Sequence, residues 1–258
     1  MSIQVSVIIA SFQRAHLLKW NLFSLSRQAV PWNFEVLVIN DGIEDETEAI
    51  CRMYKDTMNL QYIFSRQHNQ EGEPRWRVPG FAYNIGAQLS RGEILIICCA
   101  EMFHINDTIK YLSHPLMDNP RTIGIPVVVK DDRDARFLQQ LKDNDGEFDQ
   151  DLFEGNHNNL NAHNPFLISV HRQEFFAIGG YDEDFTGIGW EDNDLASRLR
   201  HSGCQYRPTE AKTIHLYHPR FAAGKRNLPD YLYNERLYRE RAGQIVRNQG
   251  RLWGRKVD

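Results

Sequence analysis

The sequence predicts an α/β fold built on a doubly wound, mostly parallel sheet of the Rossmann-like kind. Strand-like and helix-like segments alternate along the first half of the chain, which is the pattern of βαβ units. The strand-like segments are almost continuously apolar, as expected of strands covered by helices on both faces. With 258 residues and 41% hydrophobic content, the chain can bury a full core. Sheets of this kind bind ligands beyond the carboxyl ends of their strands.

The first three elements form one βαβ unit. Residues 4–10 and residues 34–40 are apolar and rich in β-branched side chains, which predicts two buried strands. Residues 14–29 predict a helix, because apolar side chains recur there at helical spacing: Ala15, Leu18, Leu22, Leu25 and Ala29. The alternation of helices and strands continues with a helix at 45–56, a strand at 60–64, a helix at 79–90 that begins with Pro79, and a strand from Glu93 to Cys99.

The regular pattern breaks between Lys130 and His163. This stretch follows a predicted strand at 122–129, is polar, and has eight acidic residues between 131 and 151. A connection of this length is typically a functional lid or an irregular subdomain. Regular structure is expected again as a strand at 166–170, a helix from Glu191 to His201 and a last helix at about 229–248.

No change of composition marks a linker inside the chain. We expect one large domain at 1–218, with halves at 1–129 and 130–218, followed by a basic helical extension at 219–258. The extension holds ten Lys and Arg against four Asp and Glu, although the whole chain has a net charge of -4. Such a surface is either simply solvated or contacts an anionic membrane surface, a partner protein or the rest of the chain.

Nothing in the sequence predicts export or membrane insertion. The first residues resemble a strand more than a signal peptide, and no apolar run approaches the roughly 18 residues that a spanning helix needs. The four cysteines, Cys51, Cys98, Cys99 and Cys204, lack CxxC spacing, which predicts reduced structural thiols. We therefore expect a cytoplasmic protein, and one without a nucleic-acid partner.

Polar side chains follow the first two predicted strands. Ser11 and Arg14 come after the first strand, where small groups such as Ala10 leave room for a planar base and Arg14 is available to a phosphate. Asp41 follows the second strand, and its carboxylate can accept hydrogen bonds from a base or a ribose. Turns after buried strands often contain such residues for structural reasons alone. The chain has no GxGxxG loop, which disfavours a nicotinamide cofactor.

Candidate metal ligands follow two later segments. Glu101 comes just after the apolar strand that ends at Cys99, where a carboxylate can bind Mg²⁺ or Mn²⁺ bridging a diphosphate. His215 and His218 can meet at one site on a turn or a helix, whereas on a strand they would face opposite ways. Imidazole combined with carboxylate suits Mn²⁺. Surface or core histidines are the alternative in a chain that has ten of them.

The strongest signal lies between residues 175 and 195. Four glycines within eleven residues indicate turns or close approach to a ligand, and Trp190 offers a flat surface suited to a sugar ring. Glu191, Asp192 and Asp194 then fall in the first turn of a helix, where the helix dipole keeps carboxylates ionised. An ionised carboxylate near a hydroxyl can act as a general base. An acidic helix cap is the alternative, but it leaves the preceding glycines unexplained.

In this order, the segments resemble family-2 glycosyltransferases of the GT-A type, with a galactosyltransferase-like C-terminal region. The resemblance runs from Val5 to His218. Val-Ser-Val-Ile-Ile-Ala-Ser-Phe-Gln-Arg resembles the family's opening strand, and Val-Leu-Val-Ile-Asn-Asp-Gly its uracil-contacting strand. Tyr83 to Ala87, with Arg91-Gly92-Glu93, resembles the helix that leads to the metal strand. The resemblance implies a nucleotide-sugar half at 1–129 and an acceptor half at 130–218. We expect acceptor choice to reside in Lys130 to His163 and in the C-terminal helix.

The resemblance also implies a donor site at the strand ends. Asp41 would contact the nucleotide base. Arg77, together with Arg75, would contact the phosphates unless both simply belong to a basic surface loop. The full set of implied donor-binding residues is Ala10, Ser11, Arg14, Asp41, Asn84 and Arg77.

The implied metal site departs from the family pattern. Glu101 stands where the family's DxD motif has its final acid, but Cys99-Ala100-Glu101 replaces Asp-x-Asp, so one carboxylate is lost. His215, with His218 as the second candidate, resembles the family's late histidine ligand and would compensate. The expected cofactor is a divalent cation, Mn²⁺ or Mg²⁺.

The acidic pair carries the implied catalysis. Asp192 would be the general base, Glu191 would contact the acceptor, and Trp190 and Gly189 would bind it. Retaining relatives of similar architecture resemble Gly-Gly-Glu-Asn here, so Asp192 predicts inversion. The implied reaction moves a sugar, expected to come from a UDP-sugar, to a hydroxyl of a glycan or another acceptor. The alternatives are a sugar nucleotidyltransferase, whose glycine-rich first loop is missing here, and an inactive binding module derived from a transferase.

Overall fold

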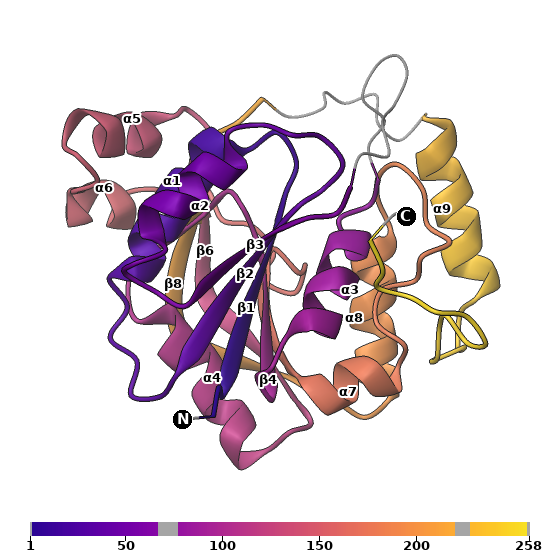
Figure 1. Ribbon diagram of the computed structural model, residues 1–258. Coiled ribbons are helices and arrows are strands. Elements are labelled where there is room, and N and C mark those ends of the chain that lie inside the picture. The colour runs from indigo at the N-terminus through magenta and orange to yellow at the C-terminus, as the bar shows by residue number, and fades with distance from the viewer. Residues whose placement is uncertain (1, 67–76, 220–227, 257–258) are drawn as a thin grey trace.

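The computed structural model of the chain describes residues 2–66, 77–219 and 228–256. Its centre is an eight-stranded sheet in the order β3-β2-β1-β4-β7-β6-β8-β5, with helices packed on both faces (Figure 1). Arg75 and most of the loop that contains it lie outside the described residues. The mixed α/β architecture predicted from the sequence is confirmed.

The first half of the chain forms the parallel side of the sheet. Strands β1, β2, β3 and β4 pair only in parallel with one another, with β1 between β2 and β4. Every strand and helix expected in this half is present, within a few residues of the expected bounds. These elements are β1 (Val5–Ser11), α1 (Ala15–Ser26), β2 (Phe34–Asn40), α2 (Thr47–Tyr54), β3 (Leu60–Phe64), α3 (Gly80–Leu89) and β4 (Ile94–Cys99).

The second half is more mixed. Strand β7 is antiparallel to β4 and β6, β5 is antiparallel to β8, and β6 is parallel to β8. The elements are β5 (Met102–His104), α4 (Thr108–Asp118), β6 (Thr122–Asp131), α5 (Arg136–Asp143), α6 (Gln150–Glu154), β7 (Leu167–His171), α7 (Arg172–Ala177), α8 (Glu191–His201), β8 (Gln205–His215) and α9 (Pro229–Glu240). The polar stretch at 130–163 thus contains two short helices. Elements β5, α4, α7 and β8 were not anticipated from the sequence.

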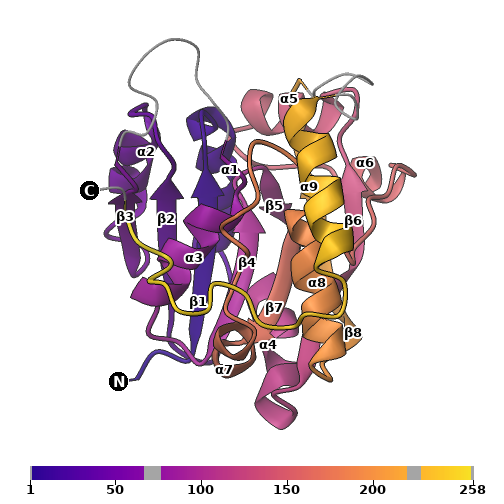
Figure 2. The same cartoon turned by 90° about the vertical axis from the view of Figure 1, so that its right-hand side faces the viewer.

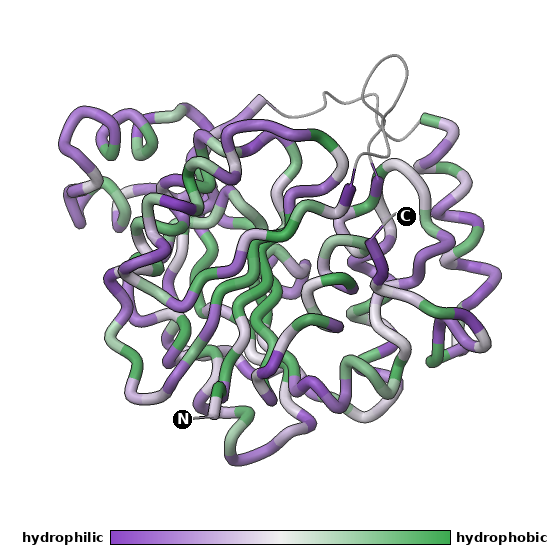
Figure 3. The backbone as a smooth tube through the Cα atoms, in the orientation of Figure 1, coloured by the Kyte–Doolittle hydropathy of each residue, from purple (hydrophilic) through white to green (hydrophobic). Residues whose placement is uncertain are grey.

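Two apolar cores lie on opposite faces of the sheet. Helices α1, α2 and α4 contribute to one core, through Leu22, Tyr54 and Leu112 among others. Helices α3, α7 and α8 contribute to the other, through residues such as Tyr83 and Leu195. Figure 3 shows the most apolar backbone segments running through the central strands. Among the described residues, no helix is both long and apolar enough to cross a membrane.

The C-terminal segment returns to the body of the protein. Helix α9 ends at Glu240 rather than near residue 248, and Gly243 then takes a left-handed conformation with φ of +84°. The chain after it runs back past α8 and α7 toward α3 (Figure 2). There the Arg247 backbone N–H donates to Ile178 (3.0 Å), and the Trp253 ring lies 5.3 Å from the Phe176 ring. The basic extension therefore contacts its own chain.

Candidate active site

A cavity of about 110 Å³ opens at the carboxyl ends of β1, β2 and β4. Most of the residues predicted to bind the donor meet there, together with the predicted metal ligand Glu101. The lining residues are Ala10, Ser11, Phe12, Arg14, Asp41, Arg77, Pro79, Ala82, Tyr83, Cys99 and Glu101. This is the position that a parallel sheet offers to a ligand.

Asp41 is held firmly at this edge. Its carboxylate accepts a hydrogen bond from the Ser65 hydroxyl at 2.7 Å and forms an ion pair with the Arg77 guanidinium. Arg77 in turn lies over the Phe81 ring, 4.4 Å from its centroid. Asp41 and Arg77 therefore form one unit, in which the carboxylate is buried and the guanidinium faces the cavity.

Asn84 was expected to belong to the donor site, but the structure does not place it in the cavity. Its side chain is fully buried. The amide donates to the Tyr181 carbonyl and to Glu183, both at 2.9 Å, and its oxygen accepts from the Tyr181 N–H at 2.9 Å. Asn84 thus ties α3 to the Gly-Gly-Tyr-Asp segment, and its hydrogen-bonding groups are committed to that contact.

The predicted metal ligands Glu101 and His215 meet at the turn between β4 and β5, together with Cys99, which was not predicted as a ligand. Donor atoms of Cys99, Glu101 and His215 all lie within 4.8 Å of one another. His218 joins them, because its Nε2 lies 3.9 Å from Glu101 Oε1 and its ring lies 5.2 Å from that of His215. The two histidines meet because β8 ends at His215 and the chain leaves the strand before His218. Glu101 belongs both to this cluster and to the wall of the strand-end cavity.

The charge around Glu101 favours its ionised form. Burial by itself would raise the pKa of the carboxyl group. The electrostatic influence of His215, His218 and Arg14 outweighs it, so the pKa of Glu101 lies below its ordinary value. Arg14 makes the tightest of these contacts, with its Nε 2.8 Å from Glu101 Oε1. Arg14, predicted to contact a phosphate, thus lies between the strand-end cavity and the cluster of Glu101, His215 and His218.

Asp131 supports this cluster and was not anticipated. It lies at the end of β6, where the sheet register pairs it with His215. Its fully buried carboxylate has Oδ1 3.8 Å from His215 Nδ1, and Arg133 pairs with it at 3.0 Å. A carboxylate behind a ligand histidine fixes the orientation of the ring and makes it a better ligand. The available signal was its place directly after a predicted strand.

The acidic pair begins helix α8, as predicted. Trp190 precedes the helix in a left-handed conformation with φ of +74°, and Glu191 and Asp192 occupy the first turn. The Tyr181 hydroxyl donates to Asp192 Oδ1 at 3.1 Å. Burial raises the pKa of Asp192 to about 6, although the hydrogen bond from Tyr181 opposes the rise. A carboxylate with this pKa is ionised at neutral pH and can still accept a proton, which suits a general base.

Trp190 and Gly189, the predicted acceptor contacts, lie against helix α9. The Trp190 ring stacks on Tyr238 at 5.2 Å and lies 5.8 Å from the Tyr231 ring. A side chain at Gly189 would collide with Tyr231, so the loop can approach α9 this closely only with glycine there. Asn234 of α9, also fully buried, accepts from the Thr186 N–H and donates to the Gly189 carbonyl. Helix α9 therefore shapes the loop that leads into the acidic pair.

Arginines of the C-terminal segment hold the same region through buried ion pairs. Asp194 of α8 pairs with Arg198 at 2.6 Å and with Arg247 at 2.8 Å. Arg247 also reaches Asp182 at 2.9 Å, and Arg241 pairs with Asp182 as well. The sequence signal was the excess of arginines after residue 219 beside the acids at 182–194. Only folding shows which of them meet.

A family model described as glycosyltransferase like family 2 matches residues 7–219. The chain belongs to this family. The match contains the strand-end cavity, the Glu101 cluster and the acidic helix. It ends before α9 and before Arg241 and Arg247, the two arginines that pair with Asp182.

Curated relatives include two bacterial transferases. The chain is 23% identical to the chondroitin synthase of Escherichia coli over 251 residues, which cover 88% of this chain and 36% of that protein. It is 27% identical to the validoxylamine A glucosyltransferase of Streptomyces hygroscopicus subsp. limoneus over 234 residues, which cover 77% of this chain and 48% of that protein. The family member described here thus spans between a third and a half of the length of these relatives.

Solved structures with the same fold are GT-A enzymes. GalNAc-T7 in complex with UDP, GalNAc and Mn²⁺ superposes with a TM-score of 0.65 at 16% identity, covering 93% of this chain and 48% of that one. The mannosyltransferase PcManGT from Pyrobaculum calidifontis, in complex with GDP-Man and Mn²⁺, gives 0.56 at 16% identity, covering 85% and 59%. At these identities the likeness establishes the GT-A fold of this family member.

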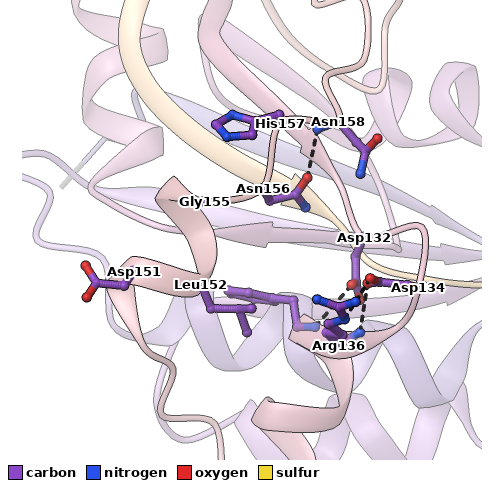
Figure 4. A pocket seen from close by; sticks show the side chains of 10 residues that line it. Asp132, Asp134, Arg136, Asp151, Leu152, Gly155, Asn156, His157 and Asn158 are labelled. Atoms are coloured by element: carbon purple, nitrogen blue, oxygen red, sulfur yellow. Dashed lines mark hydrogen bonds and ion pairs between the residues drawn. The ribbon is translucent and has the colours of Figure 1, made fainter.

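A second hollow, of about 380 Å³, lies in the insertion between β6 and β7 (Figure 4). It is lined by residues of the loop after β6, of α5, of α6 and of the segment after α6, and it contains none of the predicted site residues. Asp132 in its wall accepts from the backbone N–H groups of Phe137 and Leu138, at 3.1 and 3.0 Å. This carboxylate therefore serves to begin helix α5.

Proposed function

We propose that this family-2 chain transfers a sugar from a nucleotide-sugar donor to a hydroxyl group of an acceptor, with inversion at the anomeric carbon. One observation carries the proposal. Tyr83 lines the strand-end cavity and stacks on Tyr181 at 5.5 Å, and Tyr181 in turn holds Asp192, a carboxylate with a pKa of about 6. A donor pocket and a base are thus connected through one pair of stacked rings.

The donor would lie along the carboxyl ends of β1, β2 and β4. The small residues Ala10 and Ser11 leave space for a planar base, and the Asp41–Arg77 unit offers both hydrogen-bond acceptors and a cation. UDP is the nucleotide we expect, as the sequence resemblance suggested. Structural neighbours have been solved with UDP and with GDP-Man, so binding of the two nucleotides should be compared directly.

A divalent cation fits the cluster of Cys99, Glu101 and His215. Their donor atoms are close enough to share one ion, and Glu101 is ionised. Of the two ions expected from the sequence, Mn²⁺ suits a set with imidazole better than Mg²⁺, which prefers oxygen ligands. Such an ion would neutralise charge on the diphosphate leaving group. Arg14 would add a second positive charge at the same place.

The chain's own residues account for the proton transfer. Asp192 takes the proton of the acceptor hydroxyl. At the same time the hydroxyl oxygen forms a bond to the anomeric carbon, and the bond between that carbon and the diphosphate oxygen breaks. Attack opposite the leaving group inverts the anomeric centre. Glu191, one residue earlier in α8, and the loop at Gly189 and Trp190 would shape the space for the acceptor.

Asp192→Asn tests this assignment. The amide keeps the size of the side chain but cannot accept the proton, so kcat should fall by about 10²- to 10⁴-fold. Nucleotide affinity, measured by calorimetry with UDP, should stay unchanged. Asn193→Ala is the matched control, because Asn193 is the exposed next residue of the same helix. Transfer by Asp192→Asn at a near wild-type rate would exclude Asp192 as the base.

The replacement of the first motif acid by Cys99 favours a second candidate, a binding module without transfer activity. Release of UDP from a panel of UDP-sugars, measured with Mn²⁺ and an excess of candidate glycan acceptors, separates the two. UDP binding without release from any donor would favour the module.

A further inference from the structure

The candidate metal cluster differs from the carboxylate and imidazole set expected from the sequence in one donor, the thiol of Cys99. Cys99 ends β4 directly opposite Ala10 of β1, so its side chain lies in the wall of the strand-end cavity. Its neighbour Cys98 is buried in the core on the other face of the sheet, where the Asn21 amide lies 3.4 Å from its sulfur. Of two adjacent cysteines, only Cys99 is positioned to meet an ion beside Glu101.

We propose that Cys99 is a direct metal ligand, together with Glu101 and His215, and that the site therefore selects a thiophilic cation such as Zn²⁺ over Mg²⁺. The role of the ion in sugar transfer rests on the proposed function, whereas binding of the ion by Cys99 does not. Tetrahedral zinc ligands stand about 3.3–3.8 Å apart, given metal–ligand bonds of about 2.0–2.3 Å. Donor atoms that already lie within 4.8 Å of one another need only small side-chain movements to reach that spacing.

The surroundings supply what such a site requires. The Asp131 carboxylate stands behind His215 with its Oδ1 3.8 Å from Nδ1, so a small movement would give the hydrogen bond that orients a ligand histidine. His218 Nε2, at 3.9 Å from Glu101 Oε1, is placed to become the fourth ligand or to leave that position to a phosphate oxygen. Both histidines and the thiol are softer donors than carboxylates. Affinity of such donors for divalent ions rises from Mn²⁺ toward Co²⁺ and Zn²⁺, whereas Mg²⁺ needs octahedral oxygen ligands.

Co²⁺ provides a direct probe, because a cobalt–thiolate bond produces a charge-transfer band in the near ultraviolet. The full chain is stripped with a chelator and titrated with Co²⁺, and then with Zn²⁺, Mn²⁺ and Mg²⁺ in competition with a chromophoric chelator. The thiol proton is released to solvent when the ion binds. We expect the charge-transfer band, and displacement of Co²⁺ by Zn²⁺ but not by Mg²⁺.

Three cysteine variants make the test specific. Cys99→Ser should abolish the band and weaken Zn²⁺ binding by more than about 100-fold, since even residues behind the ligands contribute about 10- to 100-fold. Cys98→Ser, the adjacent control, should leave both unchanged. Cys99→Asp should turn the preference toward Mn²⁺. Co²⁺ binding without the band, or equal Zn²⁺ affinity in wild type and Cys99→Ser, would overturn the proposal.

These outcomes are distinct from a failure of the proposed function. Metal binding through Cys99 without any sugar transfer would retain this inference and reject the transferase. Mn²⁺-dependent sugar transfer that is unaffected by Cys99→Ser would support the transferase and reject Cys99 as a metal ligand.

Discussion

The two sides of the candidate site are held in different ways. The strand-end wall, which consists of Ala10, Asp41, Cys99 and Glu101, is fixed by neighbouring parallel strands and the turns directly after them. The helix wall, which runs from residue 179 to Asp192, is a series of left-handed turns followed by a helix. Its supports come from more than forty residues further along the chain, at Asn234 and Arg247.

This difference separates local from long-range control of a site. The backbone ladder of the sheet sets the strand-end wall, so changes in the C-terminal segment should leave nucleotide binding intact. The helix wall depends on buried side-chain contacts, because four glycines between 179 and 189 have positive φ and supply no side chains to pack. Substitutions in α9 and the segment after it should therefore weaken the acceptor side selectively.

The largest expected effect comes from Arg247→Met. This change leaves the buried Asp182 and Asp194 with one arginine fewer, and breaking such pairs costs about 3–5 kcal/mol. Because each carboxylate keeps another arginine, we expect a loss of about 3 kcal/mol in the free energy of unfolding, measured by urea denaturation. Arg239→Met, which removes only an exposed pair with Glu235, should cost about 0.5 kcal/mol or less. Similar losses of unfolding free energy in the two variants would contradict the view that buried contacts of the C-terminal segment hold the helix wall.

Asn234→Ala should have the next largest effect. It leaves the Thr186 N–H and the Gly189 carbonyl without their buried partner, which costs about 1–3 kcal/mol. Since the loop carries Trp190, KM for the acceptor should rise while the Kd for UDP stays unchanged. An equal weakening of UDP binding would show that the two walls are not independent.

Tyr181→Phe tests the contact between the walls and should have the smallest effect on stability. The hydroxyl that this variant lacks donates to Asp192 and lowers the pKa of that carboxyl group, which burial has raised to about 6. Its loss raises the pKa of Asp192 further. A base must be ionised, so the acidic limb of kcat/KM against pH should move to higher pH in the variant. If the acidic limb of kcat/KM stays at the same pH in Tyr181→Phe, ionisation of Asp192 does not determine the pH dependence of the reaction.

The strand-end wall could largely be predicted from the sequence, whereas the supports of the helix wall could not. The strands β1 to β4 could be predicted from their apolar runs. The cavity residues that directly follow these strands in the sequence could be predicted with them. Strand β8 was missed because its first half is largely exposed and polar and includes Pro208. Whether His215 and His218 share one site could not be decided until the end of β8 was known.

Residues that act through distant partners left little trace in the sequence. The pairing of Asp131 with His215 depends on the register between β6 and β8. The pairing of Arg247 with Asp182 and Asp194 depends on where the chain turns after α9. Asn84 was assigned to the donor site by resemblance, yet its amide is committed to Tyr181 and Glu183.

The contact between Arg14 and Glu101 links two binding events. Arg14 Nε donates to Oε1, the Glu101 oxygen nearest to His218 Nε2. An ion that coordinates this oxygen would compete with the guanidinium for it, and Arg14, which already lines the cavity, would then be available to a diphosphate bound there. Ion and nucleotide would then each raise the affinity of the other by the same factor, because linkage between two sites is reciprocal. A single hydrogen bond would thus make the filling of the site cooperative.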